Sequence, residues 1–237
     1  MVAIARSLIS SLAAFAASTP SNTGRGRVSS CSLRTLKLDF PANQTTLVAP
    51  TQPPKLLGLA FGVQNYTCSS AGTYTSTGAV AELFDAACMS TKSNFGTVQN
   101  DLFSLWDGTS EDVTIQDAIS ELAGMHLPGV LGQHYFVTNP KTGTGVSPKW
   151  DFTSARFQGN KDAFMIGAGN GSLPSPTDPS KDVAWLHVVN VQGKLSDVVF
   201  RYDTVGGQPP KSCTAGTDAD ISVKYASKYV FYGGQVC

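Results

Sequence analysis

The sequence predicts a mainly β fold, a β-sandwich or partly closed barrel with one inserted helix over residues about 110–124. Two observations lead to this class. Short apolar runs bounded by Gly and Asn recur along the chain, and several alternate strictly between apolar and polar residues. Charged residues make up only 14% of the chain, which contains 23 Gly and 13 Pro. This composition is typical of a β-protein with many turns.

The predicted strands follow one another between residues 56 and 231. In residues 196–204 and 221–231, apolar and charged residues alternate along the chain. This pattern predicts strands with one buried, apolar face and one solvent-exposed face. Residues 183–191 are apolar at both odd and even positions, as in a strand that is buried on both faces. The other predicted strands are shorter and cover residues 56–63, 64–68, 79–88, 131–137, 147–152 and 163–166.

One segment departs from the β pattern. In residues 110–124 the apolar residues recur at helical spacing. Thr109 or Ser110 can cap its first turn, and Gly124 can end it. We therefore expect one helix here, preceded by a helical turn over residues 100–106.

The first eighteen residues have the pattern of a secretory signal peptide. Arg6 carries the only charge, an apolar run covers residues 7–15, and small residues follow at Ala16, Ala17 and Ser18. The apolar run is too short to span a membrane, which takes about 20 residues. We expect a secreted, extracellular protein without a membrane span. It would comprise a signal peptide (1–18), a disordered segment (19–30) and a single β-rich domain (31–237).

Charge argues against nucleic-acid binding. The chain has 17 basic and 17 acidic residues, and no extended basic run occurs. In an oxidising compartment its five cysteines would pair. We expect Cys68–Cys88, at the ends of two neighbouring strands, and Cys31–Cys213. Cys237 would remain free or bridge to another molecule.

Three sequons predict glycan acceptors at Asn43, Asn65 and Asn170. Asn170 is the best placed of these, because it lies in a segment rich in Gly, Pro and Ser that we interpret as a loop. Asn65 is the least favourable, because it lies inside a predicted strand.

Several blocks of the sequence occur together in a characteristic order. They are GVQNYTC at 62–68, ELFDAAC at 82–88, LGQHYF at 131–136, PKWDF at 148–152, and FRYDTVGGQPP at 200–210 running to Cys213. This order resembles a family of secreted fungal proteins with bacterial relatives, a domain of unknown function. Its members often carry the label "malate dehydrogenase". The resemblance covers roughly residues 31–233 and implies no established catalytic residues.

The dehydrogenase label can be tested on the glycine-rich segment GAGNG at 167–171. A nicotinamide-binding site needs a glycine fingerprint between a strand and a helix, so that the helix N-terminus meets the pyrophosphate. Here glycines alternate, and Pro174, Pro176 and Pro179 prevent a helix from starting in register. We therefore reject NAD-dependent malate dehydrogenase, predict no cofactor, and interpret the segment as a surface loop.

The candidates for chemistry are histidines and carboxylates. His126 and His134 flank a predicted turn, and with Asp85 or Asp151 they could form an acid–base pair or a metal site. The spacing matches no local metal motif, so we predict no metal. His187 lies in an apolar strand, where a core histidine is expected.

Other carboxylates and aromatic residues add weaker candidates. Glu82 and Asp203 lie in the shared blocks, and we interpret residues 203–210 as a turn built by Asp, Gly and Pro. Trp and Tyr rings can stack on sugars when exposed. The candidates are Tyr135, Trp150, Phe152 and Trp185 on predicted strands, with Trp106 the one most expected at the surface.

These observations lead to two hypotheses. The first is a secreted, disulfide-stabilised, glycosylated protein that binds a cell-wall glycan or a host surface molecule without catalysis. The second is an extracellular hydrolase that uses His134 with a carboxylate such as Asp151.

Overall fold

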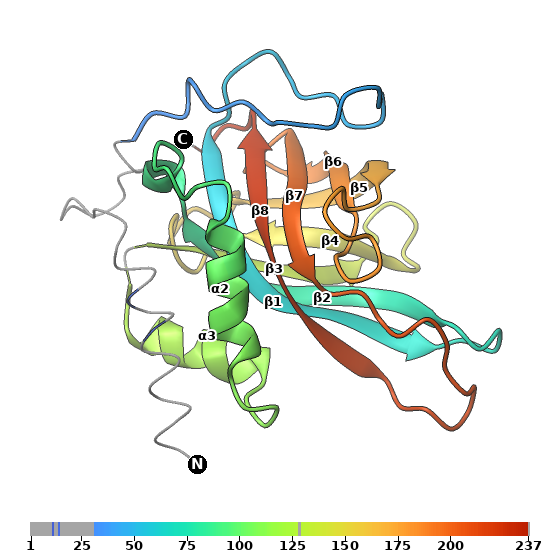
Figure 1. The fold of residues 1–237 in the computed structure, drawn as a ribbon. Helices are drawn as coiled ribbons and strands as arrows, with labels where there is room; N and C mark the ends of the chain where they lie inside the picture. Colours follow the sequence, from blue (N-terminus) through green and yellow to red (C-terminus); the bar gives the residue numbers. More distant parts are fainter. Residues whose placement is uncertain (1–10, 12–13, 15–30, 128, 237) are drawn as a thin grey trace.

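A computed structural model describes residues 11, 14, 31–127 and 129–236. These residues form an antiparallel β-barrel in which each strand pairs with the next along the chain and β8 closes on β1 (Figure 1). The strands are β1 (Leu56–Cys68), β2 (Tyr74–Asp85), β3 (Val130–Thr138), β4 (Val146–Asp151), β5 (Phe164–Leu173), β6 (Trp185–Gly193), β7 (Val198–Gly206) and β8 (Ile221–Tyr232). The predicted mainly β class is confirmed, and the barrel is fully closed.

Besides residue 128, three parts of the chain lie outside the described residues. They are the predicted signal peptide, apart from residues 11 and 14, the predicted disordered segment 19–30, and Cys237. In the part of the chain that is described, no helix is long and apolar enough to cross a membrane.

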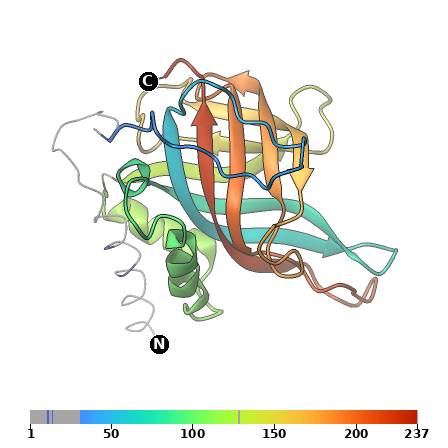
Figure 2. The ribbon, with the colours of Figure 1, turned by 45° about the horizontal axis from the view of Figure 1, so that its top comes forward.

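The strand residues alternate between two apolar clusters. One cluster draws residues from all eight described strands, among them Ala60, Leu83, Trp150, Val199 and Tyr229, and therefore fills the barrel interior. The other lies outside the wall, where β1, β7 and β8 pack against the helices and the N-terminal segment. Figure 2 shows the segment that precedes β1 crossing the outer face of β8 and β7.

Two helices cover the outer cluster where one was predicted. The helix α3 (Ile115–Gly124) begins five residues later than expected, because Thr114 and Asp117 form a capping box. The Asp117 amide donates to Thr114 Oγ1 at 3.1 Å, and the Thr114 amide donates to Asp117 Oδ2 at 3.0 Å. The predicted turn at 100–106 is part of a full helix, α2 (Val98–Asp107).

Trp106 fixes α2 to the barrel and is not at the surface as predicted. Its side chain is 0% exposed, its ring packs edge-on against Phe61 at 5.2 Å between centroids, and its Nε1 donates to the Gly62 carbonyl at 2.7 Å. The reason is that Trp106 lies on the buried face of α2 together with Val98 and Leu102.

The glycine-rich segment at 167–171 was predicted as a loop but belongs to β5, which pairs with β6 through two irregularities. A side chain at Gly171 would place its Cβ 2.6 Å from the Thr46 carbonyl oxygen. The glycines therefore allow other chain segments to approach the strand closely. The segment lies within an antiparallel strand and is followed by another strand, β6, and not by a helix.

Both predicted disulfide pairings were wrong. Cys31 bonds Cys88, and Cys68 bonds Cys213. The register of β1 and β2 gives the reason: Cys68 lies opposite Tyr74 at the hairpin end, whereas Cys88 follows the far end of β2. A strand of 12 residues separates these ends by roughly 40 Å. The Cys213 amide donates to the Gly72 carbonyl in that hairpin, which brings Cys213 to Cys68.

The alternation predicted in β7 and β8 is present, but two of its charged residues, Arg201 and Lys228, are buried. Lys228 is 0% exposed, since the outer face of β8 is covered by the segment between α2 and the short 3-10 helix η1 (Ala87–Met89). Its Nζ lies 2.7 Å from Asp203 Oδ2 and 4.2 Å from the centre of the Phe95 ring. The predicted turn at 203–210 was also wrong at its start, because β7 continues to Gly206 with Asp203 at φ +48° in an irregularity.

Candidate functional site

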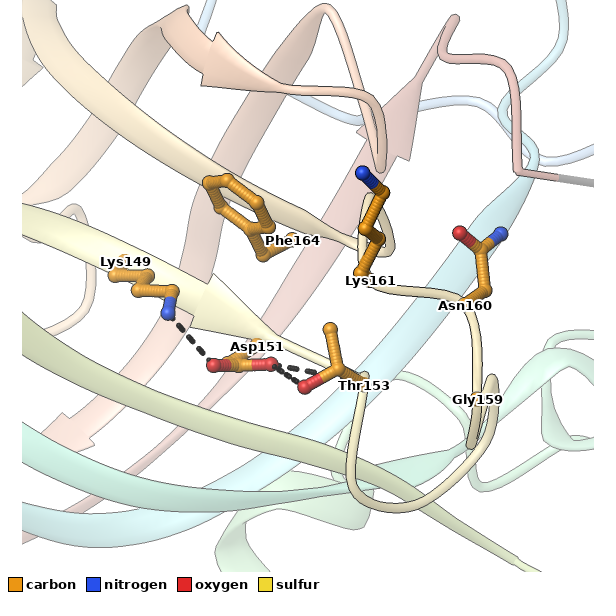
Figure 3. Close-up of a pocket in the computed structure, with 7 residues that line it drawn as sticks. All are labelled: Lys149, Asp151, Thr153, Gly159, Asn160, Lys161 and Phe164. Atoms are coloured by element: carbon orange, nitrogen blue, oxygen red, sulfur yellow. Dashed lines mark hydrogen bonds and ion pairs between the residues drawn. The ribbon is translucent and has the colours of Figure 1, made fainter.

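A pocket of about 370 Å³ opens on the outer face of β4 and β5. It is lined by Lys149, Asp151, Thr153, Gly159, Asn160, Lys161 and Phe164 (Figure 3). Alternation along β4 turns Lys149 and Asp151 outward, while Trp150 between them packs in the barrel interior.

Both carboxylate oxygens of Asp151 accept hydrogen bonds from neighbouring side chains. Tyr135 Oη donates to its Oδ2 at 2.8 Å, and Lys149 Nζ lies 2.7 Å from the same oxygen. The hydroxyl and the amide of Thr153 donate to Oδ1 at 2.6 and 3.1 Å. Burial alone would raise the pKa of Asp151, but these hydrogen bonds outweigh it and lower the pKa to about 2. The carboxylate is therefore a fixed anion.

The Lys149 ammonium contacts one carboxylate and two aromatic rings. Its ammonium lies 4.9 Å from the centre of the Phe164 ring and 5.3 Å from that of Tyr135, in addition to its contact with Asp151. Burial alone would lower its pKa, but the contacts with Asp151 and Tyr135 raise it above the usual value. Lys149 thus remains a cation throughout the physiological range.

The rim of the pocket carries a second positive charge. Asn160 and Lys161 are exposed in the connection between β4 and β5. Backbone hydrogen bonds fix this connection: the Asn160 amide donates to the Phe157 carbonyl at 2.9 Å, and the Phe152 amide donates to the Ala163 carbonyl at 3.0 Å. Two lysines and one carboxylate leave the pocket with one net positive charge.

The register of the barrel continues this polar surface toward β2. Glu82 pairs with Gln133, and Gln133 pairs with Asp151, so the three residues form one row on the outer face. Two strand spacings separate Glu82 from Asp151, about 10 Å. Glu82 is only 3% exposed, and burial raises its pKa to about 8 although a hydrogen bond with Gln133 lowers it. The row therefore carries one neutral acid and one fixed carboxylate near pH 7.

His134 lies on the other side of the wall. It is 3% exposed, stacks on Trp150 with 4.6 Å between ring centroids, and its Nδ1 lies 3.0 Å from the Lys149 carbonyl oxygen. Burial lowers its pKa to about 3, so the ring is neutral at physiological pH. Because His134 faces the interior and Asp151 faces out, the structure does not bring together the pair required by the hydrolase hypothesis.

A family model described as "Protein of unknown function (DUF3455)" matches residues 49–233. The chain belongs to this family. The matched range contains every strand of the DUF3455 barrel and the whole pocket. No curated protein and no solved structure matches the chain.

The remaining candidates are scattered over the DUF3455 barrel. His126 is exposed just after α3, at φ +50°. Asp85 is buried at the end of β2, where its Oδ1 accepts from the Ala87 amide and its Oδ2 lies 3.9 Å from Arg156 Nη2. His187 is half-buried and stacks on Phe200. Within residues 31–127 and 129–236, no group of three or more His, Cys, Asp or Glu side chains could hold a metal ion.

Most of the aromatic candidates are core residues. Trp150, Phe152 and Trp185 are buried, and Tyr135 is half-buried beside the pocket. Phe164 was not singled out from the sequence, since its role depends on the register that pairs it with Asp151.

The three sequons differ in their surroundings. Asn43 and Asn170 are exposed, the latter on β5 and not in a loop. Asn65 is half-buried on β1, and its Oδ1 accepts from Ser222 Oγ at 2.8 Å. Glycosylation at these positions stays a prediction.

The opposed shifts of Glu82 and His134 give the stability of the DUF3455 barrel a defined pH dependence. The pKa of Glu82 is raised from 4.5 to about 8, so its contribution to stability is lost as the pH rises through this window. The pKa of His134 is lowered from 6.5 to about 3, so its contribution is lost as the pH falls through that window. Between pH 4.5 and 6.5 the two effects oppose each other.

We therefore expect the free energy of unfolding to be greatest near pH 4.5–6.5 and to fall on either side, by about 1.4 kcal/mol per pH unit at most for each group. Urea unfolding between pH 3 and 9 measures this. In Glu82→Gln the decrease in the free energy of unfolding between pH 6.5 and 8 should disappear, while the decrease at acid pH that comes from His134 should remain. An unchanged alkaline fall in that variant would show that Glu82 is not its source.

Proposed function

We propose that this protein is a secreted, glycosylated binding protein whose outer pocket holds a carboxylated sugar of a cell-wall or host-surface glycan. In this proposal residues 1–18 are a signal peptide, residues 19–30 are disordered, and residues 31–237 are a single β-rich domain. The pocket between Lys149 and Lys161 is the binding site, and the protein acts without catalysis.

The observation that carries the proposal is the state of Asp151. A general acid or base works best with a pKa near the working pH and with a free position for the proton. Asp151 has a pKa lowered to about 2, and its two oxygens already accept from Tyr135, Lys149 and Thr153. Such a carboxylate orients its neighbours and suits recognition better than proton transfer.

The composition of the pocket supports an acidic sugar as the ligand. Lys161 and Asn160 at the rim offer an ammonium and an amide to a carboxylate and to hydroxyl groups. Lys149 adds a positive charge in the pocket, over the face of the Phe164 ring. With one net positive charge, the pocket would attract uronic acids more strongly than neutral sugars, and salt would weaken the attraction.

Export is supported by the two disulfides. Cys31–Cys88 and Cys68–Cys213 are bonds that persist in oxidising compartments and are rare in the cytosol. Asn43 and Asn170 are exposed, so both can carry the predicted glycans.

The test is binding of the purified protein to a panel of polysaccharides. We expect retention on polygalacturonate or alginate at low ionic strength, weaker retention on cellulose and chitin, and release by salt. Lys161→Glu replaces the exposed rim charge and should reduce binding at least tenfold. Lys92→Glu, at an exposed lysine in the connection between η1 and α2, is the matched control with the same change of net charge.

Three results would contradict this proposal. The first is equal binding of neutral and acidic glycans, and the second is no binding to any of them. The third is an equal loss of binding in Lys161→Glu and Lys92→Glu, which would show that only net charge matters.

A further inference from the structure

An arginine inside the barrel forms no ion pair with any of the described residues. Arg201 of β7 is 8% exposed. It lies on the same inward row as Val199, opposite Phe200 and Tyr202, which belong to the outer cluster. The ion pairs formed by the described residues do not include Arg201.

Its partners in the barrel are neutral. Nε and Nη2 donate to the Ala184 carbonyl at 3.1 and 2.9 Å, and Nη1 donates to Gln64 Oε1 at 3.4 Å. A guanidinium has five N–H groups, so two remain after these three bonds. A buried charge is costly unless an opposite charge or a full set of hydrogen bonds compensates it. The two remaining N–H groups of Arg201 can therefore donate to a negatively charged acceptor.

The titratable groups whose pKa is shifted by the charge of Arg201 do not provide a negatively charged acceptor. They are Tyr66 of β1, His134 of β3 and Tyr225 of β8. Burial raises the pKa of both tyrosines and lowers that of His134 to about 3. All three groups are therefore neutral at physiological pH. None of them balances the guanidinium.

The inner wall around these groups has an excess of hydrogen-bond donors. Gln64 Nε2 is buried beside Arg201 and makes no well-formed hydrogen bond among the described residues, although the Gln64 side chain lies near the Tyr225 hydroxyl and lowers its pKa. Trp150 Nε1, on the ring that stacks with His134, is likewise without one in the described part of the chain. An amide N–H and an indole N–H can only donate. The missing partner is therefore an acceptor.

We propose that the barrel interior binds one small anion, a halide or the carboxylate of a small organic acid, between the Arg201 guanidinium and the Gln64 side-chain amide. The interior of an eight-stranded barrel is wide enough either to be filled by side chains or to hold one small ligand. The anion neutralises the buried charge and accepts from the free N–H groups. This site lies on the opposite side of the barrel wall from the outer pocket and does not depend on the proposed glycan binding.

The first test is crystallographic and uses the wild-type protein. Crystals grown in sodium bromide should show an anomalous difference peak within hydrogen-bonding distance of Arg201 and Gln64. Parallel crystals in sodium formate should show density for a carboxylate at the same place if the site prefers organic acids. Either peak supports the proposal and identifies the class of anion. If neither crystal shows an anion beside Arg201, the proposal is wrong.

The second test measures thermal unfolding at constant ionic strength in chloride, bromide, formate and acetate. An anion that binds only the folded state raises the melting temperature in a saturable way. We expect this in the wild type and in Lys181→Gln, which removes an exposed lysine, but not in Arg201→Gln. A response that is the same in all three proteins would overturn the proposal. If Arg201→Gln does not fold, the crystallographic test still decides.

Discussion

Replacing Trp106 by Ala is expected to lower the free energy of unfolding by about 3–5 kcal/mol. Trp106 is fully buried between α2 and β1, packs on Phe61 and donates to the Gly62 carbonyl. The Ala variant loses the packing of a large ring and leaves that carbonyl without its partner at a buried site. Urea unfolding followed by far-UV circular dichroism measures the loss.

Trp106→Phe separates the two contributions. It retains an aromatic ring against Phe61 but cannot donate to Gly62, so we expect a smaller loss of about 1–3 kcal/mol. A loss below about 1 kcal/mol in Trp106→Ala would be incompatible with the burial described above. It would mean that α2 contributes little to the stability of the barrel.

Removing the Cys68–Cys213 disulfide has the other large expected effect. The bond closes a loop with a sequence separation of 145, for which the chain-entropy model gives about 5 kcal/mol. Native disulfides contribute about 2–5 kcal/mol in practice. We therefore expect the double variant Cys68→Ser/Cys213→Ser to lose stability within this range, as measured by urea unfolding.

The second disulfide provides a matched control. Cys31–Cys88 has a sequence separation of 57, for which the same model gives about 4 kcal/mol. The double variant Cys31→Ser/Cys88→Ser should therefore lose somewhat less stability. Peptide mapping without reductant checks the pairing itself. Recovery of a Cys68–Cys88 peptide from the native protein would contradict the connectivity.

The sequence allowed the fold class to be predicted, but not the closure of the barrel. Alternation in β7 and β8 is visible in the residues because each side chain points to one face or the other. Closure depends on the pairing of β1 with β8, which no local pattern reports. For the same reason Arg201 and Lys228 were expected on a solvent-exposed face. Arg201 is buried in the closed barrel interior, and Lys228 is covered by the segment between η1 and α2.

The candidate site could likewise be predicted only in part from the sequence. Asp151 was singled out from the sequence, but its predicted partner His134 lies on the other side of the wall. Lys149 and Phe164 meet Asp151 only because β4 pairs with β5 in one particular register. A shift of one residue would turn every side chain to the opposite face. The chemistry of the pocket is therefore set by strand pairing, which one sequence does not reveal.

Closure of β1 on β8 also constrains how this protein can be made. Leu56 pairs with Phe231 and Tyr66 pairs with Ile221, so the last seam of the barrel joins positions far apart along the chain. Contacts of such long range form late and make folding slow. Until β8 has been synthesised, β1 presents an unpaired edge that can join other chains. A chain shortened before Ile221 would leave this edge of β1 unpaired and would therefore be prone to aggregate.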